Sequence, residues 1–213
     1  MALSHSPRIV TDNLIFSMDP ANTRSYSGSG ITVNPLVSGM AGTLINGPTF
    51  STANNGCFVF DGTNDILKFG GVDILGSVYT HCAWFKMNVL QTCLVIDGGW
   101  AGTVIFSDHV EYYYSDTAPN YMNASYNFTT SRWYFICAVR GATQKQVYID
   151  GNLIQSVNSS DSYACPYNYI NLGSNSGIQN LNGNIGLVHI YGKALSAAEI
   201  KQNFEATRDR YGI

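Results

Sequence analysis

Hydrophobic and polar residues alternate with a period of two along most of the chain, the pattern of β-strands that bury one face. In residues 13–19, for example, Leu14, Phe16 and Met18 are expected to point to one side and Ile15 to the other. The segments that share this pattern are residues 13–19, 57–61, 66–69, 78–87, 92–97, 103–107, 110–114, 132–139, 146–150, 153–157, 169–172 and 184–191. So many short strands predict an all-β sandwich or barrel.

Turn residues separate these segments and support the same prediction. The pair Asp150-Gly151 lies between two apolar runs, and because both residues tolerate a positive φ it predicts a tight hairpin. Two longer polar stretches, residues 26–42 and 158–166, are expected to be surface loops, the first of them as a mobile arm.

One segment near the end of the chain has helical character. Ser196 and Glu199 have the spacing of a capping box, in which each side chain satisfies the other's backbone amide. Leu195, Ile200 and Phe204 form a narrow apolar stripe after this start. We therefore predict a C-terminal helix over residues 195–210 that packs on the sandwich.

Composition sets the size and class of the molecule. The 213 residues are 45% hydrophobic and only 12% charged, with a net charge of −3. That balance favours one large core and excludes disorder, and single β domains reach this length. We expect one domain over residues 1–213, with residues 1–12 as an N-terminal arm. The basic residues do not cluster, so nucleic acid is excluded as a partner.

The N-terminal residues and the cysteines indicate in which cellular compartment the protein is made. Residues 1–10 lack the apolar core of a signal peptide, and no apolar run is long enough to span a membrane. We expect a soluble protein made in the cytoplasm, without membrane insertion. The cysteines form no CxxC pair, and we expect reduced core thiols, with a single disulfide left open as the alternative. They are Cys57, Cys82, Cys93, Cys137 and Cys165.

Several motifs recur in a recognisable order. They are FVFDGTNDILKF at residues 58–69, QVYIDG at 146–151 and NGNIGLVHIYGKALSAAEIKQNF at 182–204, together with the aromatic strand around Trp84. In this order they resemble the concanavalin A-like lectin/glucanase superfamily, in its laminin-G-like jelly-roll branch. The resemblance implies two antiparallel sheets packed face to face, with loops or a sheet face that bind glycans or proteins. The ending looks like those of tailed-phage virion proteins.

The catalytic motif of glycanases on this fold is missing. Such enzymes carry E-x-D-x-x-E on a strand, which sets two carboxylates about 5 Å apart on one sheet face. Here Glu199 and Glu205 fall in the predicted helix, and Glu111 follows Asp108 at a spacing that places them on opposite faces of a strand. The histidines lack metal-ligand spacing. We expect a protein that is not an enzyme.

Calcium is the one cofactor that the resemblance brings into consideration, because laminin-G-like relatives hold it at a loop rim. Asn64, Asp65 and Asp73 are the candidate ligands. Acidic residues never cluster in this sequence, so the default interpretation of these three residues is turn formation, without any cofactor.

An aromatic stretch with polar neighbours supplies candidates for glycan or partner binding, since exposed rings stack on sugars. In a strand, Tyr112 and Tyr114 share one face, so one side of that strand is expected to be core. Trp84 and Trp133 lie in apolar strands and are interpreted as structural. The candidates are Trp100, Tyr112, Tyr114, Tyr121 and Tyr126.

Two functions from different classes fit these features. The first is a non-enzymatic virion surface protein, a capsid decoration or cement component assembled in the host cytoplasm. It would pack against major capsid or other virion proteins and form a homo-oligomer, since aromatic and amide contacts suit lateral packing. The alternative is a carbohydrate-binding module that attaches the particle to host surface glycans. A degenerate glycanase is a third, weaker interpretation.

Overall fold

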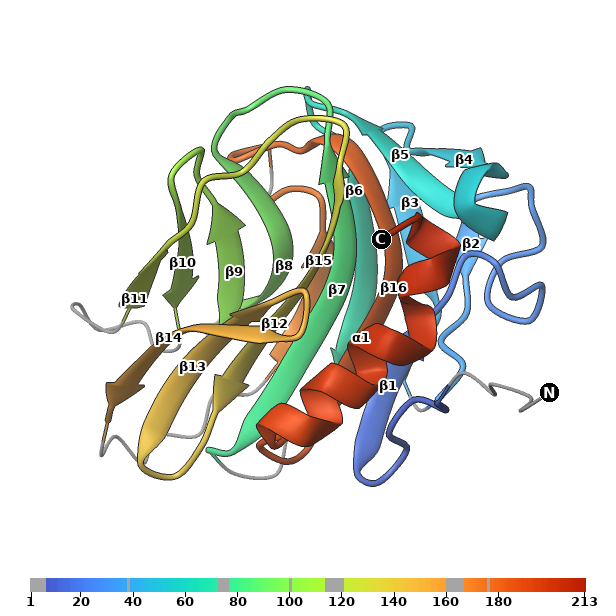
Figure 1. Cartoon of the computed structure of the whole chain (residues 1–213). Coiled ribbons are helices and arrows are strands. Elements are labelled where there is room, and N and C mark those ends of the chain that lie inside the picture. Colours follow the sequence, from blue (N-terminus) through green and yellow to red (C-terminus); the bar gives the residue numbers. More distant parts are fainter. Residues whose placement is uncertain are drawn as a thin grey trace, which may run out of the picture.

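Two antiparallel sheets of eight strands stack face to face, and one α-helix lies across the outer side of the first sheet (Figure 1). The computed structural model describes residues 7–37, 39–72, 77–99, 101–113, 121–159, 167–175 and 177–213. Sheet A runs β14-β13-β12-β7-β16-β5-β4, with β1 paired beside β16, and sheet B runs β11-β10-β9-β8-β15-β6-β3-β2. The predicted all-β sandwich with a C-terminal helix is confirmed.

The strands of each sheet come from both halves of the chain. Sheet A contains β1 (Leu14–Met18), β4 (Thr49–Ser51), β5 (Cys57–Asp61), β7 (Tyr79–Met87), β12 (Trp133–Arg140), β13 (Gln144–Ile149), β14 (Asn152–Asn158) and β16 (Asn182–Tyr191). Sheet B contains β2 (Thr32–Val33), β3 (Gly42–Ile45), β6 (Ile66–Val72), β8 (Cys93–Gly99), β9 (Gly102–Ile105), β10 (His109–Tyr113), β11 (Tyr121–Ser125) and β15 (Tyr167–Leu172). The helical elements are the 3₁₀ turn η1 (Ala53–Asn55) and α1 (Ala197–Tyr211).

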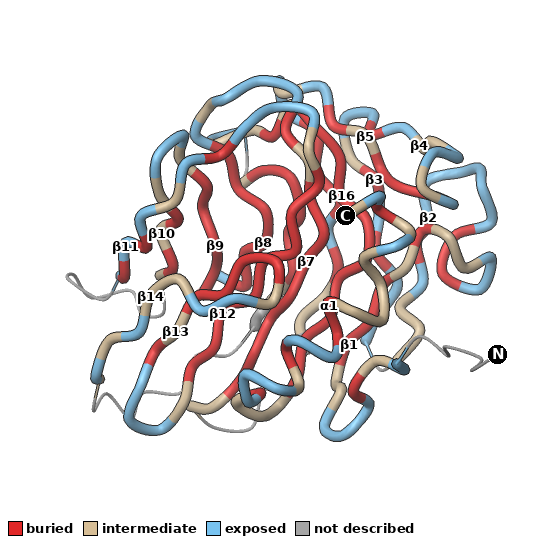
Figure 2. Tube along the Cα trace, viewed as in Figure 1, coloured by how far each residue is buried: buried red, intermediate tan, exposed pale blue. Residues whose placement is uncertain are grey.

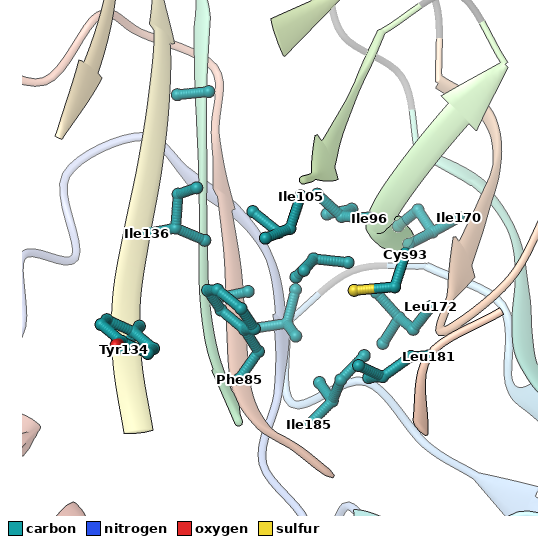
Figure 3. Packing of buried hydrophobic residues seen from close by; sticks show 14 of the residues in the cluster. Phe85, Cys93, Ile96, Ile105, Tyr134, Ile136, Ile170, Leu172, Leu181 and Ile185 are labelled. Atoms are coloured by element: carbon teal, nitrogen blue, oxygen red, sulfur yellow. The ribbon is translucent and has the colours of Figure 1, made fainter. Parts of the chain in front are cut away.

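The interior between the sheets is the main core. Phe85, Ile136 and Ile185 from sheet A meet Cys93 and Leu172 from sheet B (Figure 3). All five side chains are buried, and burial is continuous along the central strands of both sheets (Figure 2). This packing results from the period-two alternation, because each strand turns alternate side chains toward the other sheet.

Strand β1 shows where the alternation breaks. Phe16 and Met18 face the core between the sheets as predicted, but Leu14 packs on the opposite side of sheet A. The pairing of β1 with β16 shifts register between Leu14 and Phe16, and this bulge reverses the direction of the side chains that precede it.

A second core lies between the outer face of sheet A and α1. The Trp84 ring stacks on Tyr211 with centroids 4.2 Å apart, and its indole Nε1 donates to Thr207 Oγ1 at 2.9 Å. Trp133 packs on the same Tyr211 ring at 4.7 Å. Both tryptophans are buried, so their structural role is confirmed, and α1 closes this face of sheet A.

The ends of α1 follow the sequence signals. The Ser196 backbone N–H donates to Glu199 Oε2 at 2.8 Å, and the Glu199 N–H donates to Ser196 Oγ at 3.3 Å, which is the predicted capping box. At the other end Gly212 adopts φ 72°, which a glycine accepts without a Cβ clash. None of the described helices has both the length and the apolar character needed to cross a bilayer.

The described part of the N-terminal arm is held against α1. The Val10 N–H donates to Asn203 Oδ1 at 2.7 Å, while the Tyr191 hydroxyl donates to the Val10 carbonyl at 3.0 Å. The stretch over residues 26–42 also differs from the expected mobile arm. Tyr26 packs on Phe58 at 5.0 Å, and Val33 is fully buried in β2, so this stretch is fixed to the sandwich at its start and in its middle.

One cysteine prediction is corrected by the structure. Cys82 on β7 and Cys137 on β12 face each other across paired strands, with Cα atoms 4.1 Å apart, and form a disulfide. Cys57 and Cys93 are free and buried, as expected. Sequence spacing did not indicate the bridge, because its two cysteines meet only through strand register. Cys165 lies outside the described residues.

Candidate functional site

The outer face of sheet B carries a transverse row of polar and aromatic residues. Strand register places Thr43 beside Lys68, Lys68 beside Asn171, and Asn171 beside Asp97. The row continues from Asp97 through Gly102, Tyr113 and Tyr121. No described helix or strand covers it, since α1 packs on the opposite side of the molecule.

Asp97 is the polar centre of this row. The Tyr113 hydroxyl donates to its Oδ1 at 2.6 Å, and the Gly99 N–H donates to the same oxygen at 2.7 Å. Burial, followed by the Asp97 charge, raises the pKa of Tyr113, so this phenol keeps its proton. Glycine at position 102 is required, because a Cβ there would collide with the backbone carbonyl of Ile96 as well as with the Tyr113 hydroxyl.

Two acceptor oxygens in the row lack partners. Asp97 Oδ2 and Asn171 Oδ1 are buried, and neither receives a hydrogen bond from the part of the chain that the structure describes. The two residues are direct neighbours across β8 and β15. Most buried acceptors in folded proteins are satisfied, so adjacent unsatisfied oxygens on a sheet's outer face mark a place for an external donor.

An open groove lies beside these oxygens. Its volume is about 380 Å³, and the Lys68 ammonium sits 5.5 Å from the centroid of the Tyr169 ring at its wall. Burial, the charge of Asp97 and a hydrogen bond to the Asp97 side chain raise the pKa of Tyr169. The lining residues are Ala41, Thr43, Ile45, Lys68, Phe69, Gly70 and Tyr169.

The predicted aromatic candidates are dispersed. Tyr121 is 50% exposed and stands on the outer face of β11, directly beside Tyr113 in register. Tyr126 is half-buried and packs on Phe128 at 4.9 Å, away from the row. Trp100 and Tyr114 lie outside the described residues.

Tyr112 requires a correction. Its side chain is fully buried between the sheets, and its hydroxyl donates to the Tyr79 hydroxyl at 2.9 Å. It is therefore a core residue, because β10 turns Val110 and Tyr112 inward and leaves Tyr113 on the outer face.

Sequence reasoning missed Lys68, Asp97, Asn171 and Tyr169. The alternation in residues 169–172 was visible, but it does not tell which side of the strand faces solvent. The useful signal was a polar residue between two apolar ones in two strands: Asn171 lies between Ile170 and Leu172, and Lys68 lies between Leu67 and Phe69.

The calcium candidates have structural tasks. Asp65 is buried and its Oδ2 accepts the backbone N–H of Asp61 at 3.0 Å, which closes the turn after β5. Burial raises the pKa of Asp65. The Asn64 carbonyl accepts Asn46 Nδ2 at 2.9 Å. Among the described residues, no three His, Cys, Asp or Glu side chains gather as metal ligands. Asp73 lies outside the described residues.

Asp108 and Glu111, the sequence pair considered for glycan cleavage, lie just before β10 and within it. Asp108 is exposed and pairs with His109 Nδ1 at 2.7 Å, which lowers the pKa of Asp108. Glu111 stands on β10 opposite Val104 and Asn123. What the outer face of sheet B offers a ligand is the acceptor oxygens of Asp97 and Asn171, the Lys68 cation and aromatic rings.

Comparison with known protein families assigns this chain to a superfamily. Residues 61–201 match the family described as the concanavalin A-like lectin/glucanases superfamily, which covers well over half of the chain. The chain belongs to this superfamily. No curated protein sequence matches it.

Several solved structures share the fold. A sialidase from Trypanosoma rangeli in complex with sialic acid has a TM-score of 0.72 at 13% identity, over 97% of this chain and 36% of that one. The binding domain of botulinum neurotoxin serotype D has a TM-score of 0.71 at 18% identity, over 91% of this chain and 52% of that one. This chain therefore spans about a third to a half of these two proteins.

A third similar structure has the same size as this chain. It is domain 4 of AbnA, a GH43 extracellular arabinanase from Geobacillus stearothermophilus, in complex with arabinotriose. The TM-score is 0.69 at 15% identity, over 90% of this chain and 98% of that one. At such identities the likeness shows the fold alone.

Proposed function

We propose that this protein is a non-enzymatic, lectin-like binding module that holds carbohydrate chains on the outer face of sheet B. The observation that carries the proposal is the uncovered row from Thr43 to Asp97, where two buried acceptor oxygens adjoin an aromatic-walled groove. A family of lectins and glucanases and an equally sized domain in complex with arabinotriose support it.

The chemistry of the row suits sugars. Tyr169 provides an aromatic face on which a pyranose or furanose ring stacks through its C–H groups. The acceptors Asp97 Oδ2 and Asn171 Oδ1 need donors, and vicinal sugar hydroxyls are paired donors at short spacing. Lys68 and Thr43 supply donors for ring and hydroxyl oxygens along the groove.

The test is a binding titration with defined probes. Arabinotriose and sialic acid are titrated into the protein by calorimetry, and a glycan array extends the panel. We expect saturable binding of at least one glycan, with no release of reducing sugar on prolonged incubation. Absence of binding across the array would overturn the carbohydrate proposal, and hydrolysis would overturn the non-enzymatic part.

A matched pair of lysines locates the site. Lys68→Ala removes a cation that lies over Tyr169 at 5.5 Å, whereas Lys201→Ala removes one that lies over Phe204 on α1 at 4.8 Å. We expect the first variant to weaken glycan binding by roughly tenfold, as the loss of one charged hydrogen bond does, and the second to leave it unchanged. Equal effects would place the glycan elsewhere.

As a second candidate, we propose that the module serves as a virion surface protein that packs against capsid neighbours. Exposed apolar side chains on two neighbouring loops favour protein contact: Val89 is 48% exposed, Leu90 43% and Ile178 67%. The Gln91 side-chain amide donates to the Asn180 carbonyl and brings the two loops together. This candidate predicts a concentration-dependent oligomer that Ile178→Asp disrupts, measured by sedimentation. A monomer at all concentrations that does not bind capsid shells would contradict it.

A further inference from the structure

A second cavity lies on the opposite side of the molecule, where α1 crosses sheet A. Its volume is about 290 Å³, and its walls come from the N-terminal segment, β1, the loop after it, β16 and α1. Leu36, Leu187 and Ala206 make its apolar wall, whereas His189, Asp19 and Arg210 are polar. It is separate from the row on sheet B, which faces the other way.

His189 is the unexplained group in this cavity. The residue is 2% exposed, and neither Nδ1 nor Nε2 has a hydrogen-bond partner in the described chain. A neutral imidazole carries one N–H donor and one acceptor, so this side chain leaves both unsatisfied. Buried polar groups without partners are rare in folded proteins, which indicates that something else pairs with this ring.

The charges around the ring cancel. Arg210 Nη1 donates to Asp19 Oδ1 at 2.7 Å, and the other two guanidinium nitrogens donate to the carbonyls of Asn54 and Gly56. Burial lowers the pKa of His189 to about 4, against the opposing charge of Asp19, so the ring is neutral at pH 7. A charged ligand would find no free counter-charge here, and desolvating it would be costly.

We propose that this cavity binds a small neutral molecule that has an apolar body and one hydroxyl or amide group, which pairs with His189. The volume supports this class, because a pocket of about 290 Å³ has room for a small molecule. The apolar wall of Leu187 and Ala206 receives the body, and the imidazole selects the polar group.

The test uses benzyl alcohol as the probe, with toluene and benzoate as the apolar and anionic comparisons. The imidazole nitrogens of His189 are followed by long-range ¹H–¹⁵N correlation spectra of the wild-type protein during each titration. We expect saturable shifts of the His189 nitrogens with benzyl alcohol, and affinities roughly tenfold weaker for toluene and benzoate. Unchanged His189 signals, or shifts that do not saturate, would mean that only ordered water fills the cavity and would overturn the proposal.

Two methionine substitutions on α1 locate the ligand. Ala206→Met fills the cavity wall, whereas Ala198→Met adds the same atoms at an exposed position of the same helix. We expect the first variant to abolish benzyl alcohol binding and the second to preserve it. Equal binding by both variants would overturn the proposal. Glycan binding should be unchanged in both, which keeps this test independent of the proposed function.

Discussion

The outer faces of the two sheets differ in their side chains and in what covers them, although both sheets are built from eight antiparallel strands. On sheet A the outward side chains are Trp84, Trp133 and Phe135, and α1 buries them in a second core. On sheet B the corresponding positions hold Lys68 and Asp97 with their polar neighbours, and no described element covers them. The same alternating pattern thus produces a packing face and a face available for a ligand.

The difference teaches that in this sandwich the helix determines which sheet face is left open for a glycan. A sheet needs one buried face to be stable, and its second face is free unless another layer needs it. Because α1 and the N-terminal segment occupy the outer face of sheet A, the open outer face is that of sheet B, where Asp97 Oδ2 and Asn171 Oδ1 are unsatisfied. Stability and glycan binding should therefore separate by face.

The largest effect is expected from Trp84→Ala on the covered face. The substitution removes a ring stacked on Tyr211 at 4.2 Å and the hydrogen bond to Thr207, and we expect a loss of about 3–5 kcal/mol in unfolding free energy. Urea denaturation followed by circular dichroism measures it. Trp84→Phe, which keeps an aromatic body, serves as the control and should lose less. A loss below 1 kcal/mol would mean that α1 is not part of the core.

Per residue, the effect of acidification should come next in size, because two histidines are buried in neutral form. Burial lowers the pKa of His81 to about 3 and that of His189 to about 4, below the unfolded value of 6.5. Between these values the unfolded chain binds more protons, so stability is complete above pH 6.5 and is lost as the pH falls toward 4. We expect each histidine to contribute roughly 3 kcal/mol to this loss.

Urea titrations at steps from pH 8 to pH 4 measure this dependence, and hydrogen exchange of α1 reports on the His189 side. The sheet A side should loosen with acid before the outer row of sheet B does. An unfolding free energy that stays constant between pH 7 and pH 5 would contradict the neutral burial of both rings.

A smaller effect is expected from Ser196→Ala at the start of α1. The substitution removes the Oγ that accepts the Glu199 N–H, and loss of such a cap costs about 1 kcal/mol. Ser125→Ala at an exposed position of β11 is the matched control and should be neutral. Thermal melts of both variants make the comparison, and equal melting temperatures would show that the cap does not stabilise the helix.

The smallest change in stability is expected from Tyr169→Ala on the open face. The ring is half-buried and packs on no second core, so the unfolding free energy should change by less than about 1 kcal/mol. Glycan affinity should nevertheless fall by roughly tenfold or more. A large loss of stability with unchanged affinity would reverse the roles that we assign to the two faces.

Much of the fold could be predicted from local patterns. The strand over residues 57–61 and the hairpin at Asp150-Gly151 were predicted correctly, because alternation and positive φ are properties of a few neighbouring residues; Asp150 adopts φ 52° and Gly151 φ 76°. Strand β11 was missed because Asn123 and Ala124 have low strand propensity, and its place comes from pairing with β10.

The candidate site was harder to predict, because it depends on register and on what covers each face. Asp97 and Asn171 lie 74 positions apart in sequence by their numbers, and they become neighbours only through the pairing of β8 and β15. Tyr112 was a binding candidate and is a core residue, whereas Tyr113, which was not a candidate, stands on the outer face. Nothing in a run of three tyrosines tells which one meets the opposite sheet.

The most direct test of the account is hydrogen–deuterium exchange of the wild-type protein, with and without a glycan that binds in the array. We predict slower exchange in β6, β8 and β15 on binding and unchanged exchange in α1. Protection confined to α1 and sheet A, with sheet B unaffected, would contradict the assignment of the binding face.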